Sequence, residues 1–143
     1  MDDTDKSLIR ELSMDARTSV STLARRLGLA RTTVQARLEK LERSGVIAGY
    51  TVKLGDATRL NRIRATVLVR FDPRTGPHVV QRLKSMPEVE VAHTASGRFD
   101  LVLQLGTANT ERLDKVLDDI GAIKGVQSSE SLIHLSTKID RAI

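Results

Sequence analysis

The 143-residue chain contains no cysteine and no tryptophan, and aromatic residues make up only 2% of it. The absence of cysteine excludes disulfides and thiolate metal sites. Three scattered histidines, His78, His93 and His134, lack the paired spacing of a metal-binding helix, so we expect no metal and no other cofactor. The scarcity of aromatic side chains also removes the platforms on which unpaired nucleic-acid bases stack.

Long apolar runs are missing as well. No stretch is long enough to cross a bilayer, and the opening MDDTDKS is acidic, unlike the cationic start of a signal peptide. We therefore expect a cytoplasmic protein that has no membrane partner. A chain of this length fits one domain or two small ones.

Two short helical patterns joined by a turn at Gly28 are the clearest signal in the chain. They lie in residues 19–49, SVSTLARRLGLARTTVQARLEKLERSGVIAG. Apolar side chains recur at helical spacing in both patterns, in the second at Val34, Leu38 and Leu41. This is a helix-turn-helix layout, whose second helix can enter the major groove of DNA.

Capping residues predict where the helices of this module begin and end. Asp2 can cap a helix that begins at Asp3, and Ser19 can cap the next one. The third helix should begin near Arg31 and stop at Gly45. Three helices then form the N-terminal module.

The excess of positive charge lies in this module. Seven lysines and arginines lie between residues 17 and 43 against two glutamates, so this stretch accounts for the whole net charge of +5. A basic patch on one helical module is typical of a surface that binds phosphates, although a solvated face is the alternative. Together with the helix-turn-helix pattern, the patch predicts binding to double-stranded DNA.

From Ile63 onward the apolar period changes from helical to alternating. IRATVLVRF predicts a strand, a helix should follow from Pro77, and VEVAHTA and FDLVLQL predict two strands around Gly97. Asn109 can cap a second helix, and the last strand is expected within SESLIHLSTKI. The order βαββαβ is the ferredoxin-like arrangement.

The predicted fold class is therefore α+β, with a winged-type helix-turn-helix module followed by a ferredoxin-like domain. We expect the first domain over residues 1–50, an extended segment and linker over 51–62 with the boundary near Leu60, and the second domain over 63–143.

One face of the predicted sheet has no helix to cover it. Alternation directs Leu68 and Val102 to that face, with either Ile133 or the pair Leu132 and His134. An apolar face in so small a domain indicates a homodimer, although scattered surface aliphatics are the alternative.

The whole chain resembles the Lrp/AsnC family of leucine-responsive and asparagine-responsive regulators, also called feast/famine regulatory proteins. The resemblance rests on DDTDKSLIRELSMDAR, LARRLGLARTTVQARLEKLERSGVIAGY, TASGRFDLVL and GVQSSESLIHLS in this order. It implies a transcriptional regulator, not an enzyme, acting at the nucleoid. It also implies a C-terminal domain that dimerises, often assembles further into tetramers or octamers, and binds a small effector, commonly an amino acid.

The same resemblance assigns the residues that contact DNA. They are Arg25, Arg26, Arg31, Thr32, Thr33, Gln35, Ala36, Arg37 and Lys40. Gln35 could read adenine through its paired donor and acceptor, and Arg25 and Arg26 are candidates for backbone contacts. Arg37 lies beside the apolar stripe, so a salt bridge within the module is an equal alternative.

For the effector, the resemblance implies a site formed by Gly97, Asp100, Gln127, Ser129 and Ser131. Asp100 would hold the ammonium group of an amino acid, while backbone N–H and hydroxyl groups would hold its carboxylate. Gly97 could instead only permit a turn, and Asp100 could pair with Arg98.

The chain departs from the usual family pattern at two places. Ala30 replaces a serine before the third helix, which removes a cap worth about 1 kcal/mol. Ser129 and Ser131 stand where threonines are common, which leaves open which effector fits.

Two other functions are alternatives to DNA-binding regulation. Some enzymes that decarboxylate haem precursors share this architecture, and His93 and Arg98 could serve such a reaction, but no arginine cluster accompanies them. An effector-binding module that no longer contacts DNA is disfavoured by this local excess of positive charge.

Overall fold

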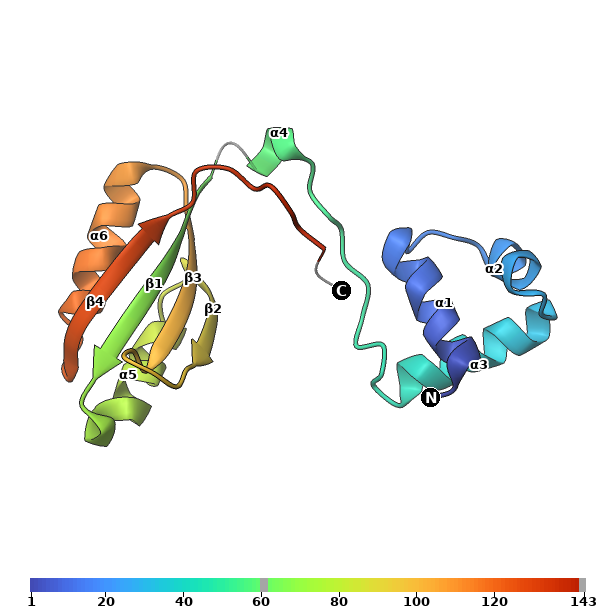
Figure 1. The fold of residues 1–143 in the computed structure, drawn as a ribbon, viewed down its shortest axis with the longest axis horizontal. Coiled ribbons are helices and arrows are strands. Elements are labelled where there is room, and N and C mark those ends of the chain that lie inside the picture. Colours follow the sequence, from blue (N-terminus) through green and yellow to red (C-terminus); the bar gives the residue numbers. More distant parts are fainter. Residues whose placement is uncertain (60–61, 142–143) are drawn as a thin grey trace. The chain divides into compact units, whose positions relative to one another are not determined.

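A computed structural model describes residues 1–59 and 62–141 (Figure 1). Residues 1–53, together with Arg141, form one compact unit, and residues 54–140 form the other. The boundary expected near Leu60 lies outside the described residues. Within the described part of the chain, no helix is long and apolar enough to cross a membrane.

The first unit contains three helices, α1 (Asp3–Met14), α2 (Val20–Leu27) and α3 (Arg31–Arg43). Their predicted caps are confirmed. The Asp2 carboxylate accepts a hydrogen bond from the Asp5 N–H at 2.9 Å, and Ser19 accepts one from the Thr22 N–H at 3.1 Å. Gly28 ends α2 with φ 65°, a left-handed conformation that favours glycine.

The predicted apolar stripes form the core of this unit. Leu8, Leu23 and Val34 are fully buried, one from each helix. Burying such a side chain contributes about 1.5–3 kcal/mol, so the stripe of α3 fixes which of its faces remains outside. Ala30 makes no side-chain hydrogen bond to the start of α3, as its missing hydroxyl predicts, and α3 ends two residues before Gly45.

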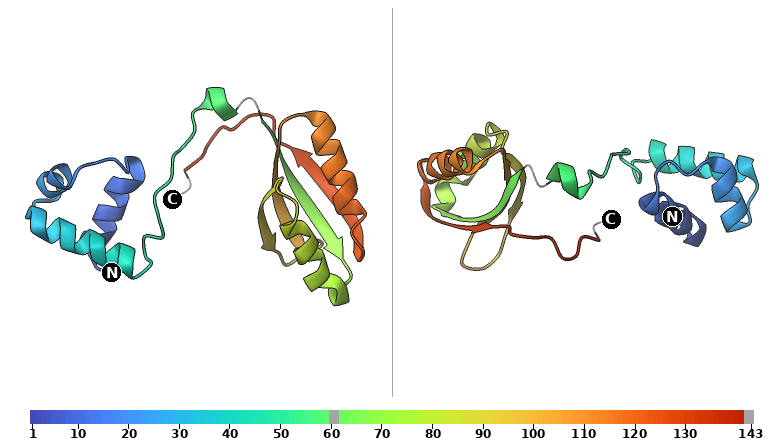
Figure 2. Two further views of the ribbon diagram at one scale, coloured as in Figure 1. Left: turned by 180° about the vertical axis from the view of Figure 1, so that it is seen from behind. Right: turned by 90° about the horizontal axis from the view of Figure 1, so that it is seen from above.

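The second unit contains α4 (Asp56–Arg59), β1 (Ile63–Phe71), a short 3-10 helix (Pro73–Thr75), α5 (Gly76–Lys84), β2 (Val89–Thr94), β3 (Leu101–Thr107), α6 (Thr110–Gly121) and β4 (Val126–Ile133). The strands form one antiparallel sheet in the order β2-β3-β1-β4. Both α5 and α6 lie on the same face of this sheet (Figure 2). The predicted ferredoxin-like fold is therefore confirmed.

The core of this unit lies between the sheet and its two helices. The alternation of β1 directs Ala65, Val67 and Val69 into it, and all three are fully buried. Leu103 of β3 pairs with Val67, and Ile120 is the most deeply buried side chain of α6. No helix of residues 54–59 and 62–140 covers the opposite face of the sheet.

Two element limits differ from those expected, and one further helix is present. α5 begins at Gly76, one residue before Pro77, and β3 begins at Leu101. Phe99 therefore lies outside the strand, where the Arg98 guanidinium lies 5.7 Å from its ring centre. α4 is a single helical turn within the expected linker.

The last strand is also earlier and shorter than SESLIHLSTKI predicted. β4 can continue only while β1 is beside it, and β1 begins at Ile63. The final backbone contact runs from the His134 N–H to the Arg64 carbonyl at 2.9 Å. Register also decides which β4 residues lie on the open face: Ile133 is opposite buried Ala65, whereas Leu132 is opposite Thr66. The pair Leu132 and His134 therefore faces outward.

Candidate functional site

The outer face of α3 is polar and accessible. Thr32, Gln35, Ala36 and Lys40 are exposed, while Thr33 is half-buried. The Gln35 side-chain amide donates to the Glu39 carboxylate at 3.1 Å. The bond uses one N–H of the amide, so its second N–H and its oxygen remain available for a base edge.

The five cationic candidates divide into two groups. Arg25, Arg31 and Lys40 are exposed, and none of them forms an ion pair with another described residue. Arg26 instead donates to the Glu11 carboxylate of α1 at 2.8 Å. Its charge is therefore partly neutralised within the module.

Arg37 is the second engaged cation. Its Nη1 donates to both carboxylate oxygens of Asp2, at 2.9 and 2.8 Å, and to Asp5 at 3.0 Å. The contact joins α3 to the capping residues of α1, over 35 and 32 positions of sequence. We call Arg37, Asp2 and Asp5 the α1–α3 clasp. The structure thus contains the salt bridge that was the alternative to a phosphate contact.

The clasp lowers the pKa of the Asp2 carboxyl group. The hydrogen bond from the Asp5 N–H, and then the one from Arg37, hold the pKa of Asp2 below its ordinary value of 3.8. The two carboxylates in turn raise the pKa of Arg37. The Asp2–Arg37 pair is therefore charged at neutral pH, and its contribution is lost as the pH falls through the lowered pKa of Asp2.

Sequence analysis missed a contact between α3 and the segment that follows it. The Tyr50 hydroxyl donates to the Glu42 carboxylate at 2.8 Å, and the Ile47 N–H donates to the Leu41 carbonyl at 3.0 Å. Burial, followed by the hydrogen bond to Glu42, raises the pKa of Tyr50. Residues up to 50 are thus tied to α3. Only the position of the chain's single tyrosine could have indicated this.

In the second unit, Gly97 and Asp100 lie in the connection between β2 and β3. Gly97 has φ 127°, so a turn alone already requires glycine there. The Asp100 N–H donates to the Val69 carbonyl at 2.8 Å, and its carboxylate accepts from the Phe71 N–H at 3.0 Å. No ion pair joins Asp100 to Arg98 within the described residues.

The β4 residues expected at the effector site lie on the other side of β1. Ser129 is opposite Val69, and Ser131 is opposite Val67, so both are on the face that the helices cover. Gln127 lies at the register shift between Arg70 and Phe71. Asp100 and Ser129 flank β1 from opposite sides, about two strand spacings or 10 Å apart. The structure therefore places Asp100 on one side of β1 and the three β4 residues on the other, and Asp100 and Ser129 are not in contact.

Polar groups cross the middle of the open face. The Thr66 hydroxyl lies 2.7 Å from His134 Nε2 and 3.3 Å from the Gln104 side-chain oxygen. Nearer the start of β1, Glu90 pairs with Arg64 at 2.7 Å. The remaining open-face side chains in register include Leu68, Val102 and Leu132. Among residues 1–59 and 62–141, no three His, Asp or Glu side chains are placed to hold a metal ion.

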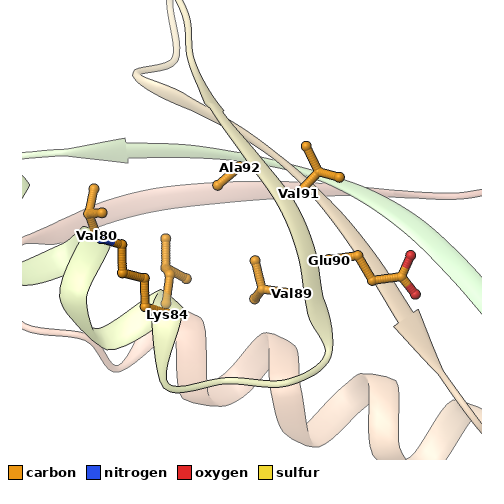
Figure 3. Close-up of a pocket in the computed structure, with 7 residues that line it drawn as sticks. Val80, Lys84, Val89, Glu90, Val91 and Ala92 are labelled. Atoms are coloured by element: carbon orange, nitrogen blue, oxygen red, sulfur yellow. The ribbon is translucent and has the colours of Figure 1, made fainter. Parts of the chain in front are cut away.

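A pocket of about 260 Å³ lies between α5 and the edge strand β2, away from the expected effector residues. Val89 and Ala92 point from β2 toward the helix, whereas Glu90 points away from it (Figure 3). Neither His93 nor Arg98, the residues of the enzymatic alternative, lines this pocket.

The helical module and the ferredoxin-like unit define a two-part regulator of the helix-turn-helix class. Residues 1–42 match the AsnC-type helix-turn-helix domain, and residues 64–143 match the Lrp/AsnC ligand binding domain. The chain belongs to the Lrp/AsnC family. It is a transcriptional regulator that combines a helix-turn-helix domain with a ligand-binding domain.

Similar proteins cover nearly the whole chain. A helix-turn-helix transcriptional regulator of Pyrococcus furiosus is 34% identical over 96% of this chain and 94% of its own. The structure of E. coli AsnC has a TM-score of 0.90 at 26% identity, covering 100% of this chain and 97% of that one. A feast or famine regulatory protein from M. tuberculosis, solved in complex with L-methionine, is 33% identical with a TM-score of 0.86 and covers 99% and 97%.

Proposed function

We propose that α3 is the recognition helix of an amino-acid-responsive transcriptional regulator. The observation that carries this proposal is the exposed face of α3, where Gln35 and Thr32 lie between cations that make no ion pair with described residues. Gln35 and Ala36 are placed to meet base edges, with Thr32 and Thr33 at the rim of the groove. Arg25, Arg31 and Lys40 supply phosphate contacts, which fix the register without reading sequence.

Gel shifts on a preferred and a random duplex test this assignment. Gln35→Ala should cost about 1–3 kcal/mol on the preferred duplex and little on the random one, because only the former offers the matching base. The matched change Lys40→Ala should weaken both duplexes alike. Equal losses from Gln35→Ala on both would remove Gln35 from base reading.

The second unit is proposed to bind an amino acid near Asp100 and Gly97. Support comes from the similar M. tuberculosis protein, whose structure holds L-methionine. In this chain the Asp100 carboxylate has one oxygen bonded to the Phe71 N–H, and its other oxygen has no hydrogen bond from a described residue. A carboxylate held in this way can accept an ammonium group.

Asp100→Asn separates this role from the structural one, because the amide oxygen keeps the bond from Phe71 while the charge is lost. We expect the variant to fold with near-wild-type stability and to lose most of its affinity for L-methionine in calorimetry. Unchanged affinity would show that Asp100 only closes the end of β1. A panel of other amino acids in thermal-shift assays covers the case in which methionine is not the effector.

The open face of the sheet is proposed as the homodimer interface. Leu68, Val102 and Leu132 would otherwise leave an apolar surface in water. A two-fold symmetric dimer presents two recognition helices to a DNA site with the same symmetry. Larger assemblies such as tetramers or octamers can form from such dimers. The amino acid then acts by binding differently to two assembly or DNA-bound states.

A further inference from the structure

A short side chain, Ala92, lines the pocket between α5 and β2 at the edge of the sheet. Ala92 is opposite buried Leu103 and points toward α5, which ends at Lys84 (Figure 3). Val80 and Leu83 of the helix and Val89 of the strand form the other apolar walls. A larger residue at position 92 would fill the space.

Two charged side chains line this pocket, Lys84 and Glu90, and they point in different directions (Figure 3). The Lys84 side chain runs along α5 toward Val80, and no described carboxylate lies within ion-pair distance of it (Figure 3). Glu90 also borders the pocket but points to the other side of β2, where it pairs with Arg64 at 2.7 Å and Arg62 at 3.7 Å. An ammonium group therefore lies at the rim of an aliphatic pocket with no anion to neutralise it.

Two features of the surrounding backbone act in opposite directions on an anion. β2 is an edge strand, so the backbone groups on its outer side have no strand partner. The C-terminal end of α5 carries partial negative charge, and Arg82 and Lys84 in its last turn offset that charge. A ligand with one carboxylate can thus reach Lys84 and unpaired N–H donors of the strand together.

We propose that this pocket binds a short branched aliphatic carboxylate that has no ammonium group, such as a branched-chain 2-oxo acid. Its volume of about 260 Å³ is below the ~300–1,000 Å³ typical of larger ligands, which limits the occupant to a few carbons. The aliphatic tail packs between α5 and Ala92, and the carboxylate pairs with Lys84. An amino acid of the same skeleton is disfavoured, because its ammonium group would approach that of Lys84.

Two matched ligands test the proposal on the full-length protein. Calorimetry and methyl-resolved NMR would be run with 4-methyl-2-oxopentanoate and with L-leucine, which share their aliphatic tail. We expect the oxo acid to shift the methyl signals of Val80 and Val89 and to bind at least about tenfold more tightly than L-leucine at these residues. Methyl signals of Val80 and Val89 that do not move would overturn the proposal.

Three variants locate the site. Ala92→Leu should fill the pocket and weaken binding of the oxo acid at least tenfold, and Lys84→Gln should weaken it to a similar extent. Lys115→Gln, at an exposed lysine of α6, and Asp100→Asn, at the separate amino-acid site, should leave it unchanged. If Asp100→Asn leaves the affinity for L-methionine unchanged, the result contradicts only the proposed amino-acid site and not the pocket between α5 and β2.

Binding that survives both Ala92→Leu and Lys84→Gln would refute the site. If Ala92→Leu instead changes the sedimentation coefficient of the ligand-free protein, the pocket is covered by a second copy of the chain, and the proposal is also wrong. If Ala92→Leu unfolds the protein, the Lys84→Gln and Lys115→Gln pair and the wild-type NMR shifts still decide the outcome.

Discussion

Salt dependence of DNA binding distinguishes the cations that can contact phosphates from those that the module already uses. Each phosphate contact lowers the slope of log K against log salt by about 0.9. If all five candidate cations contacted phosphate, two modules would give a slope of about −9. Of these five candidates, only Arg25, Arg31 and Lys40 have no ion-pair partner among the described residues, which gives about −5.4.

The two slopes predict very different losses of affinity over salt concentrations that are accessible to measurement. Between 50 and 200 mM salt, a slope of −5.4 lowers affinity about 2,000-fold, whereas a slope of −9 lowers it about 250,000-fold. Fluorescence anisotropy on a random duplex over this range gives the slope directly. A random duplex is chosen because its binding depends on phosphates alone.

Two substitutions on the same helix provide the matched comparison. Lys40→Gln should reduce the slope of a two-module complex by about 1.8, because one phosphate contact is lost from each module. Arg37→Gln should leave the slope unchanged, because Arg37 is held by Asp2 and Asp5. A fall of similar size for Arg37→Gln would refute the division of cations that the structure gives.

Asp2→Asn provides an additional test of the α1–α3 clasp. Electrostatics alone predicts tighter binding to any duplex, because a negative charge near the DNA is removed. A role of the clasp in positioning α3 predicts a smaller preference for the specific duplex over the random one. Tighter binding with an unchanged preference would show that the clasp does not position the recognition helix.

Three further outcomes are expected. Ala30→Ser should stabilise the first unit by about 0.5–2 kcal/mol in chemical denaturation by capping α3, and an unchanged or lowered stability would contradict this. Tyr50, the chain's only tyrosine, should ionise above its ordinary pKa of 10.0 in an ultraviolet titration, and its contact with Glu42 should be lost as the pH rises through this raised pKa. Glu42→Gln should lower the titration midpoint only in part, because burial is the larger cause of the shift. Val102→Glu should weaken the proposed dimer about a hundredfold in sedimentation experiments, and an unaffected dimer would place the interface elsewhere.

Local patterns predicted the elements well because their causes are local. Ser19 and Gly28 set the limits of α2 through hydrogen bonding and backbone conformation within a few residues. Alternation in β1 predicted its buried face for the same reason. The end of β4 was not predictable in this way, since it depends on where β1 begins, about 70 residues earlier along the chain.

The candidate sites show the same limit more strongly. The basic side chains of α2 and α3 were predictable from the sequence, but their ion-pair partners are distant along the chain. Glu11 is 15 positions from Arg26, and Asp2 is 35 positions from Arg37. Asp2 caps α1 and Glu11 lies within it, so local sequence identifies them only as a capping residue and a surface charge. Which cations remain available for DNA is therefore a property of the packed module and not of its local sequence.

The contact between Tyr50 and Glu42 bears on how an effector can act under the proposed function. Because residues up to 50 are tied to the C-terminal end of α3, the segment that leaves the helical module begins as part of it. An amino acid bound in the second unit then has no need to distort the recognition helix. It can act by favouring one spacing of two otherwise unchanged modules, which requires only that it bind more tightly to the assembly with that spacing. Effector and DNA affinities must then change each other by the same factor, whereas loss of the Tyr50 contact in Tyr50→Phe should reduce this factor without changing effector affinity in the absence of DNA.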